Sequence, residues 1–309
     1  MARKRKAVKV KSTRSRSSRV LTWLAAARGP FLRWIAPPVA LAALVVFGLS
    51  YARSYVSRSP RYQVDRPELV LPDGLPGFWR RTLIREIGRY ARVDGRSVLD
   101  RSMLADLARQ YERSPWVQEV AWVQTEFPNR VRAQIRVRYP AAALVYDVGG
   151  AEVYYLVGTD GVRLPRVYRG GLPETVDVPS IRGVQVSPPR PGRPWPSPAV
   201  TGAIEIIRQL RSSKIVRKAL EVRAVDASNY GGEQATRSEF RVACNHNCDV
   251  DWGRAPGTRA VGELPVEKKV AKLERHILRG DPVRNRVLSV RFPGRIVVSR
   301  KLEWHGSNG

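Results

Sequence analysis

The stretch SPWVQEVAWVQTEFPNRVRAQIRVRYP, residues 114–140, decides the fold of the chain. In its second part, apolar residues alternate with basic or polar ones, and the apolar positions are Val131, Ala133, Ile135 and Val137. Successive side chains of a strand point to opposite faces of a sheet. The pattern therefore predicts a strand with one buried face and one basic face, of which Arg130, Arg132, Gln134, Arg136 and Arg138 form the second.

The first part of the stretch is rich in β-branched and aromatic residues, which predicts a second strand. Phe127-Pro128-Asn129 predicts the turn between the two strands. The paired strands leave one question open. The arginines can face acidic partners or lipid headgroups, or they can simply keep the sheet soluble.

Two amphipathic segments precede these strands. GFWRRTLIREIGRYA, residues 77–91, places Leu83, Ile84, Ile87 and Tyr90 close to one helical face. LDRSMLADLARQYERSPW, residues 99–116, has an apolar stripe of Met103, Leu104, Leu107, Ala108 and Tyr111. Asp100 or Ser102 can cap this second helix. Because SPRYQVDRPELVLP (59–72) leads into a strand, the expected order is strand, helix, helix, strand, strand.

The charge of the chain is high and unevenly placed. The 309 residues include 55 Lys and Arg against 27 Asp and Glu, a net charge of +28. Such an excess predicts an anionic partner, and nucleic acid, anionic lipid and an acidic cell envelope all qualify. Residues 1–33 hold 11 of the basic residues and no acidic one. We interpret them as a disordered basic tail, which can be a solvated segment, a topology signal or a lipid-touching segment.

The segment WIAPPVALAALVVFGLSYA, residues 34–52, contains no charged residue and has an arginine on either side. Its length approaches the ~20 residues needed to cross a hydrocarbon core of ~30 Å. Trp34 and Tyr51 stand where interfacial anchors are expected. Two adjacent prolines near its start suit the first turn of a helix. We predict a single transmembrane helix, with a buried core helix and a cleaved signal peptide as alternatives.

The basic N-terminal residues predict the orientation of this helix, because positive charge favours the cytoplasmic side. The N-terminus is then cytoplasmic, and residues from about 53 onward lie outside the cytoplasm. An exported domain does not meet the chromosome. We therefore expect membrane lipid as a neighbour and no nucleic acid as a partner.

The cluster CNHNC at residues 244–248 carries the two cysteines of the chain. EFRVA and DVDW on either side read as the arms of a hairpin, and facing hairpin positions lie near the Cα separation of ~5.5 Å that a disulfide prefers. An oxidising exterior favours that bond. We predict a disulfide between Cys244 and Cys248, with free thiols as the alternative. A metal site is less favoured, because it lacks a fourth ligand.

The sequence contains no nucleophile elbow, phosphate-cradling glycine loop or zinc-protease motif. Its scattered acidic residues single out no glycosidase pair. We therefore expect a protein that is not an enzyme and that needs neither a cofactor nor a metal.

Several segments together carry a family resemblance. Residues 114–144 resemble the second half of a POTRA domain, and a POTRA directly after one transmembrane helix resembles the FtsQ/DivIB family of bacterial cell division proteins. YYLVGTDGVRLP (154–165) and VPSIRG (178–183) resemble a strand pair and a Pro-Gly segment of that family. Residues 252–280 resemble its closing helix, and VLSVRFPGRIVVSRK (287–301) resembles its final strand pair.

The resemblance implies a function without catalysis. It implies a scaffold of the divisome that is anchored in the inner membrane at the division site, with its C-terminal domains in the periplasm. This scaffold links partners of the FtsB and FtsL type and helps to control the septal peptidoglycan synthases. The terminal strand region would dock FtsB, and Ile296, Val297, Val298 and Ser299 would line its edge. Two alternatives remain open. The strand can be an ordinary one protected by its own Arg and Lys, and the chain can be an anchored envelope-binding module without a division role.

The expected fold class is α+β, with one transmembrane helix, a POTRA domain and a second mixed, mostly antiparallel β domain that has a C-terminal helix and strand pair. The predicted boundaries are a tail at 1–33, the transmembrane helix at 34–52, a linker at 53–60, the POTRA domain at 61–140, the β-rich domain at 141–304 and a tail at 305–309. A Pro-rich insert at 187–198 interrupts the β-rich domain.

Overall fold

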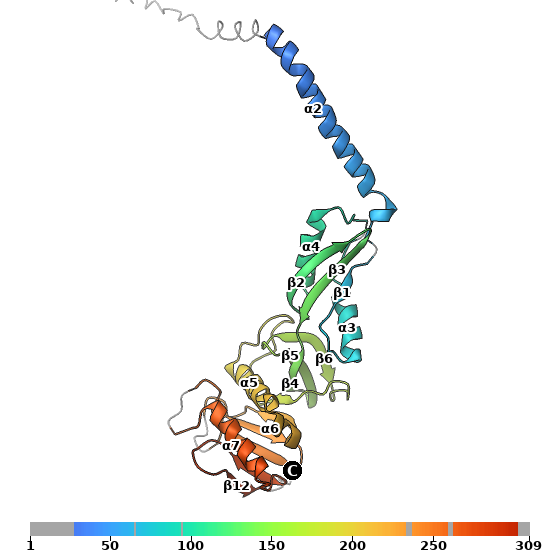
Figure 1. Ribbon diagram of the computed structural model, residues 1–309. Coiled ribbons are helices and arrows are strands. Elements are labelled where there is room, and N and C mark those ends of the chain that lie inside the picture. Colours follow the sequence, from blue (N-terminus) through green and yellow to red (C-terminus); the bar gives the residue numbers. More distant parts are fainter. Residues whose placement is uncertain (1–27, 65, 94, 233–236, 259–261, 302–309) are drawn as a thin grey trace, which may run out of the picture. The chain divides into compact units, whose positions relative to one another are not determined.

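The computed structural model describes residues 28–64, 66–93, 95–232, 237–258 and 262–301 (Figure 1). The chain forms two units, Met1–Gln63 and Val64–Gly309. The described part of the first unit contains the helix α2 (Arg28–Ser57) and the short 3₁₀ turn η1 (Pro60–Tyr62). The second unit contains two sheets.

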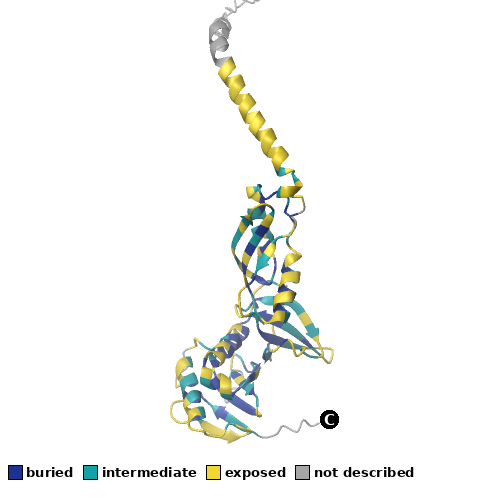
Figure 2. Cartoon of the chain, turned by 45° about the vertical axis from the view of Figure 1, so that its right-hand side comes forward, coloured by how far each residue is buried: buried dark blue, intermediate teal, exposed yellow. Residues whose placement is uncertain are grey.

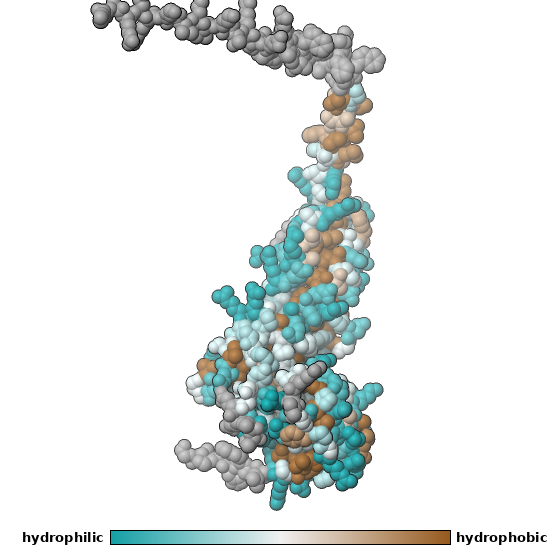
Figure 3. Space-filling model, turned by 90° about the vertical axis from the view of Figure 1, so that its left-hand side faces the viewer, coloured by the Kyte–Doolittle hydropathy of each residue, from teal (hydrophilic) through white to brown (hydrophobic). Residues whose placement is uncertain are grey.

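Helix α2 is apolar and exposed along the length whose side chains are described (Figures 2 and 3). The segment Pro37–Ser57 spans 21 residues, and no residue of its most apolar stretch is buried. A helix rises ~1.5 Å per residue, so this segment reaches the ~30 Å of a hydrocarbon core. The helix is thus long and apolar enough to be a membrane span, a test that an N-terminal signal sequence also passes.

The helix differs from the predicted span at both ends. It begins at Arg28, inside the predicted tail, and it continues through residues 53–57, which were expected to be linker. Pro37 and Pro38 lie inside it rather than at its start. Of the predicted anchors, Tyr51 is exposed, whereas the side chain of Trp34 lies outside the described residues. Residues 1–27 of the predicted tail at 1–33 and the whole predicted tail at 305–309 lie outside them too.

The small sheet of the second unit has the predicted order of elements. These are β1 (Glu68–Val70), α3 (Gly77–Gly88), α4 (Arg101–Glu112), β2 (Val117–Glu126) and β3 (Arg130–Val137). In space the strand order is β1-β3-β2, with β1 parallel and β2 antiparallel to β3. The 114–140 stretch is therefore the strand pair that the sequence predicts, and β3 buries the predicted residues Val131, Ala133, Ile135 and Val137.

The helices of this sheet form for local reasons. Asp100 caps α4 by accepting a hydrogen bond from the Ser102 backbone N–H at 3.0 Å. The residues of α4 that the sheet buries most deeply are Met103, Leu107 and Tyr111. The predicted stripe of α3 is only half correct. Leu83 and Ile87 are buried, but Ile84 is 44% exposed, and Tyr90 lies beyond the end of the helix. Trp79 of α3, which was not part of the predicted stripe, is also buried in the core.

The basic face of β3 is not a continuous cationic ribbon. Arg136 pairs with Glu119 of β2 at 2.9 Å, and Arg132 pairs with Glu68 of β1 at 3.3 Å. Both pairs are cross-strand neighbours in the sheet register. Because the carboxylates of both neighbouring strands partly neutralise the arginines, this face offers an anionic polymer less charge than the sequence of β3 indicates.

The large sheet has nine described strands in the order β12-β11-β10-β9-β8-β7-β4-β5-β6. Its first strands are β4 (Pro140–Val148), β5 (Ala151–Gly158), β6 (Arg163–Arg169) and β7 (Ser180–Arg182). Its remaining strands are β8 (Val222–Asp226), β9 (Phe240–Cys244), β10 (Cys248–Gly253), β11 (Arg286–Ser289) and β12 (Val297–Arg300). Among the described strands, five neighbouring pairs are antiparallel and three are parallel, so the sheet is mixed, as expected.

Three helices accompany this sheet: α5 (Pro198–Ser212), α6 (Lys214–Ala219) and α7 (Val266–Leu278). The face of α5 that meets the sheet includes Val200, Ala203 and Ile207, all buried. Gly202 lies so close to Phe240 of β9 that an added Cβ would stand 2.9 Å from its ring. The helix α7 is the predicted closing helix, whereas α5 and α6 were not predicted.

The Pro-rich insert at 187–198 is an ordered part of the second unit. Its Trp195 is buried, and its ring stacks on Tyr146 of β4 at a centroid distance of 6.0 Å. The backbone N–H of Gly192 donates to the Arg163 carbonyl at 2.8 Å, and the Arg163 N–H donates to the Arg193 carbonyl at 2.9 Å. The insert therefore covers the start of β6 and then leads into α5.

Candidate functional site

The strand β12 forms one edge of the large sheet. It pairs antiparallel with β11, with Val297 opposite Ser289 and Val298 opposite Leu288. No other described strand pairs with its outer side. All four of its residues are exposed, and Val297 is 68% exposed. A strand that presents unpaired N–H and C=O groups in this way can accept a further strand.

The hydrogen bonds around β11 show which main-chain groups of β12 are free. The Val290 N–H donates to the Asp251 carbonyl of β10 at 3.1 Å, so the odd-numbered residues of β11 point to β12. The Lys301 N–H donates inward to the Asn285 carbonyl at 3.1 Å. Since N–H groups alternate along a strand, those of Val297 and Ser299 also point inward, and that of Val298 points outward.

The four predicted partner-binding residues therefore play different roles. The main-chain N–H of Val298 points away from β11, and its side chain lines a groove beside α7. The side chain of Ile296 lines the same groove and also packs on the core. Val297 and Ser299 use their main chain to hold β11, and their side chains alternate to the opposite face of the sheet. The sequence predicted the edge but could not separate these roles.

The groove between α7 and the β11–β12 pair has a volume of about 940 Å³. Its cationic lining residues are Lys268, Lys272, Arg275, Arg279, Arg286 and Arg295. The only carboxylate on its described lining is Asp281, which pairs with His276 Nδ1 at 3.2 Å. Apolar surface comes from Leu264, Pro282, Pro293, Ile296 and Val298. The groove thus favours an occupant that is acidic and partly apolar.

Most of the positive charge of the groove is uncompensated. In the described part of the chain, no carboxylate lies within ion-pair distance of Lys268, Arg279 or Arg295. Lys272 is different, because its Nζ donates to the Phe292 carbonyl at 2.8 Å. Burial, together with the charge of Arg275, lowers the pKa of Lys272. Lys272 therefore holds the β11–β12 connection, while the other cations face solvent.

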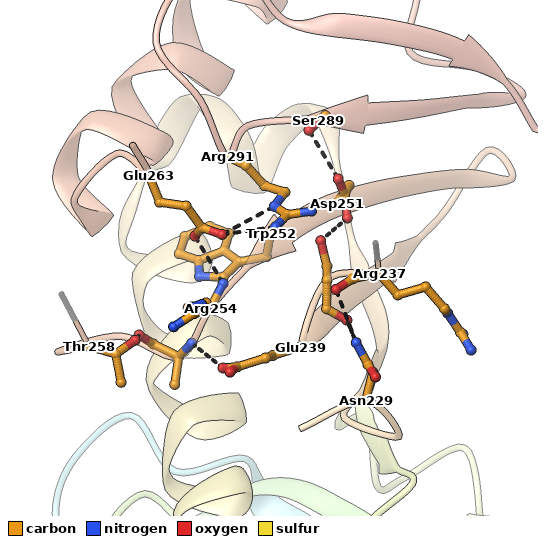
Figure 4. A network of polar contacts seen from close by, with 12 residues as sticks. Asn229, Arg237, Glu239, Asp251, Trp252, Arg254, Thr258, Glu263, Ser289 and Arg291 are labelled. Carbon is orange, nitrogen blue, oxygen red and sulfur yellow. Dashed lines mark hydrogen bonds and ion pairs between the residues drawn. The ribbon is translucent and has the colours of Figure 1, made fainter. Parts of the chain in front are cut away.

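A buried polar network joins the elements that form this groove, and Figure 4 shows part of it. The Glu263 carboxylate accepts from the Arg254 N–H at 3.0 Å and from Lys269 Nζ at 3.0 Å, and it pairs with Arg291 at 3.2 Å. Lys269 Nζ also donates to the Trp252 carbonyl of β10 at 2.8 Å. These contacts join α7, β10 and the β11–β12 connection, so they hold the groove in place.

The electrostatics of this network depend on charge pairing. Burial on its own would raise the pKa of Glu263, but its hydrogen bonds and the two cations hold the pKa below the ordinary value. Burial lowers the pKa of Lys269, and Glu263 opposes that shift. The carboxylate and the ammonium are therefore kept charged by one another, and removal of one leaves the other buried without a counter-charge.

Cys244 and Cys248 lie opposite one another at the ends of β9 and β10. The predicted hairpin is thus confirmed, with Asn245-His246-Asn247 as its loop. Both thiols are buried and separate, and the predicted disulfide stays a prediction. Within the described residues, no group of three or more His, Cys, Asp and Glu side chains could hold a metal ion.

The cations that α7 contributes to the groove were missed from the sequence. A signal for them exists in residues 266–279, because Val270, Leu273 and Ile277 pack on the core while the intervening positions are mostly basic. A helical projection of that segment separates an apolar face from a cationic one. What the sequence could not show is that β12 lies beside that cationic face.

No protein-family model matches this chain, and no curated protein matches it either. The structure thus defines a mixed α+β chain with one long apolar helix near the N-terminus, a small sheet with two helices, and a large mixed sheet with a closing helix.

Proposed function

We propose that this chain is a membrane-anchored scaffold of the bacterial division machinery and that it has no catalytic role. In this proposal α2 spans the inner membrane with the basic N-terminus in the cytoplasm, and the second unit lies in the periplasm. The observation that carries the proposal is the exposed β12 edge beside a cationic groove, at the position where the FtsQ/DivIB resemblance implies partner docking.

The proposed partner is a segment of the FtsB type, itself associated with an FtsL-type protein. A partner strand would pair with the outward N–H and C=O of Val298, and acidic side chains beside it would meet Arg295 and the cations of α7. Main-chain pairing gives affinity, while the charges give orientation and rate. Through this partner pair, the scaffold would help to control the septal peptidoglycan synthases.

The element order supports the division assignment over a general β-rich receptor. A long apolar helix is followed by a strand-helix-helix-strand-strand unit, which is the order of a POTRA domain. The large sheet then ends in a helix and a strand pair, as the resemblance implies. We propose that the small sheet is a POTRA domain that contacts membrane partners near the anchor.

A second candidate is an anchored module that binds an anionic envelope polymer. The excess of cations over carboxylates in the groove favours it. The two functions differ in what they require of β12. Polymer binding through charge alone would fall steeply with salt and would not depend on the outward N–H of Val298. Strand addition requires that N–H at any salt concentration.

The division role is tested by imaging an N-terminal fluorescent fusion, expressed at native level, through the cell cycle. The scaffold predicts a band at the constriction site. An even membrane rim throughout constriction would contradict a division role and leave the envelope-binding candidate.

A further inference from the structure

The hairpin that carries both cysteines also contacts residues next to strands β11 and β12. Cys244 and Cys248 are direct partners in the register of β9 and β10, so their side chains lie on the same face. That face is the hydrophobic core, where Cys244 is 8% exposed and Cys248 is fully buried. A cross-strand pair of this kind has the Cα separation that a disulfide needs without moving the backbone.

The loop between the cysteines is bonded to the place where β11 begins. The Asn285 N–H donates to the His246 carbonyl at 3.1 Å, and Asn247 Nδ2 donates to Asn285 Oδ1 at 3.1 Å. All three residues have a left-handed backbone, with φ of 57° at His246, 52° at Asn247 and 56° at Asn285. Residues other than glycine adopt such φ values uncommonly, and Asn and His do so most readily, so these contacts join three residues of tight turns.

The same corner holds the far end of β12. The Asn285 carbonyl accepts the Lys301 N–H at 3.1 Å. Lys301 Nζ pairs at 2.8 Å with Asp249, the residue after Cys248. A continuous path of hydrogen bonds and one ion pair therefore leads from the cysteine hairpin, through Asn285, to the residue that follows β12.

We propose that Cys244 and Cys248 form a disulfide that fixes the hairpin loop and, through Asn285 and Lys301, anchors the end of the β12 edge strand. The disulfide and the anchoring do not depend on the proposed function. Only a consequence for partner binding at β12 rests on it. The ring that the bond closes contains only the three loop residues between the cysteines, so its effect is expected in the loop and its contacts rather than across the sheet.

The chemistry is a thiol–disulfide exchange with an external disulfide, such as that of an oxidoreductase or oxidised glutathione. One cysteine thiolate attacks that disulfide, which forms a mixed disulfide and releases one thiol. The second cysteine then displaces the other half as a second thiol. The two protein sulfurs lose two electrons and two protons in total, and the two released thiols carry them.

The structure also predicts when the bond forms. Burial, with the nearby Cys248 and Asp249, raises the pKa of Cys244, and burial with Asp249 raises the pKa of Cys248 to about 11. Buried thiols with a raised pKa present little thiolate to an oxidant. We therefore expect the bond to form while the chain folds, before the core closes over the hairpin, and to form slowly once the reduced protein is folded.

The test uses the full chain in detergent micelles, refolded once with oxidised glutathione and once with a reductant. Mass spectrometry after thiol labelling reports the bond, and hydrogen exchange reports the peptides that contain Asn285 or Lys301. We expect the bond after oxidative refolding and about tenfold slower exchange at both amides in the oxidised protein. The same oxidant added to folded, reduced chain should give the bond far more slowly.

Two controls separate the bond from its anchoring role. Cys244→Ala/Cys248→Ala should show no difference between the two refolding conditions. Asn247→Ala keeps both cysteines and the main-chain hydrogen bond from Asn285 to His246 but removes the side-chain contact to Asn285, so oxidation should slow exchange at Asn285 and Lys301 less than in the parent chain. Thiols that stay free after oxidative refolding would overturn the disulfide, and a bond that leaves the Asn285 and Lys301 amides unchanged would overturn the anchoring. Neither result bears on whether a partner docks at β12.

Discussion

The two edge strands of the large sheet, β6 and β12, differ in how far other segments cover them. At one edge, β6 has its first residue, Arg163, hydrogen-bonded on both its N–H and its C=O to the Pro-rich insert. Pro165 offers no N–H, and Arg166 lies 3.7 Å from Glu86 of α3. At the other edge, β12 is exposed at all four residues, and nothing in the described part of the chain covers it.

The difference between the two edges supports the docking role that we propose for β12. Proteins commonly block edge strands with proline, charge or a covering loop, because a free edge invites pairing with other chains. This chain applies proline and a covering segment to β6. It leaves β12 open and places a cationic groove beside it. Under the proposed function, the cations of the groove would make this edge favour an acidic strand over a basic one.

The largest effect on stability is expected from a substitution that loosens the Pro-rich insert from the β6 edge. Trp195→Ala removes the buried ring that holds the insert against Tyr146 and Tyr155. We expect a loss of about 4 kcal/mol in the free energy of unfolding, as for a large-to-small change in a core. We also expect self-association through the freed β6. Urea denaturation and size-exclusion chromatography measure the two effects.

The matched control for this variant is Arg190→Ala, an exposed position of the same insert. It should change neither stability nor oligomeric state. If Trp195→Ala loses stability yet stays monomeric at high concentration, the insert packs the core but does not protect an edge, and the contrast between the two edges is lost.

The next largest effect on stability is expected from the buried ion pairs of Glu263, which join the elements beside the β12 edge. Glu263→Gln leaves Lys269 and Arg291 without their counter-charge in a buried site. We expect a loss of about 3 kcal/mol, the cost of breaking a buried ion pair. Glu267→Gln, at an exposed position of α7 four residues further on, should be nearly neutral. A loss below about 1 kcal/mol for Glu263→Gln would mean that the network does not hold the groove.

The same carboxylate predicts a dependence of stability on pH. Because the folded pKa of Glu263 lies below its ordinary value, its stabilising effect is complete above that ordinary value and is lost as the pH falls through the folded pKa. Unfolding free energy measured from neutral pH downward should therefore fall less in Glu263→Gln than in the parent chain. Parallel curves for the two proteins would contradict this assignment.

A smaller effect is expected from the charge beside the open edge. Arg295→Glu reverses one uncompensated cation of the groove, whereas Arg169→Glu reverses an exposed arginine on the covered edge. We expect about fivefold weaker binding of an acidic FtsB-type partner for the first and no change for the second. The difference should shrink at high salt. Equal effects of the two substitutions would show that overall charge, rather than the groove, attracts the partner.

The sequence predicted what depends on local pattern. The alternation in 130–138 gave β3, the Asp100 cap marked the start of α4, and the apolar run near the N-terminus gave α2. It also predicted a strand at the end of the described chain and the cysteine hairpin. These features need only neighbouring residues, whose spacing determines which face is buried.

What the sequence could not predict depends on contacts between distant segments. Residues 198–212 are the exception, because the helix start signal at Ser197-Pro198 and the apolar face of α5 are both local, although α5 was not predicted. The insert itself has no period that reveals its pairing with Arg163. The inward and outward directions of the β12 main chain follow from Asn285 and from β10, which lie far away in the sequence.

The central claim is that β12 is an open edge to which a partner adds a strand, and one pair of variants tests it most directly. Val298→Pro removes an outward N–H and should leave the β11–β12 pairing intact, while Val298→Ala shortens the same side chain and keeps the N–H. Binding of the FtsB-type partner to the full chain in micelles should weaken at least tenfold for the proline variant and only slightly for the alanine variant, with similar melting temperatures. Unchanged affinity in a folded Val298→Pro protein would contradict strand addition at β12.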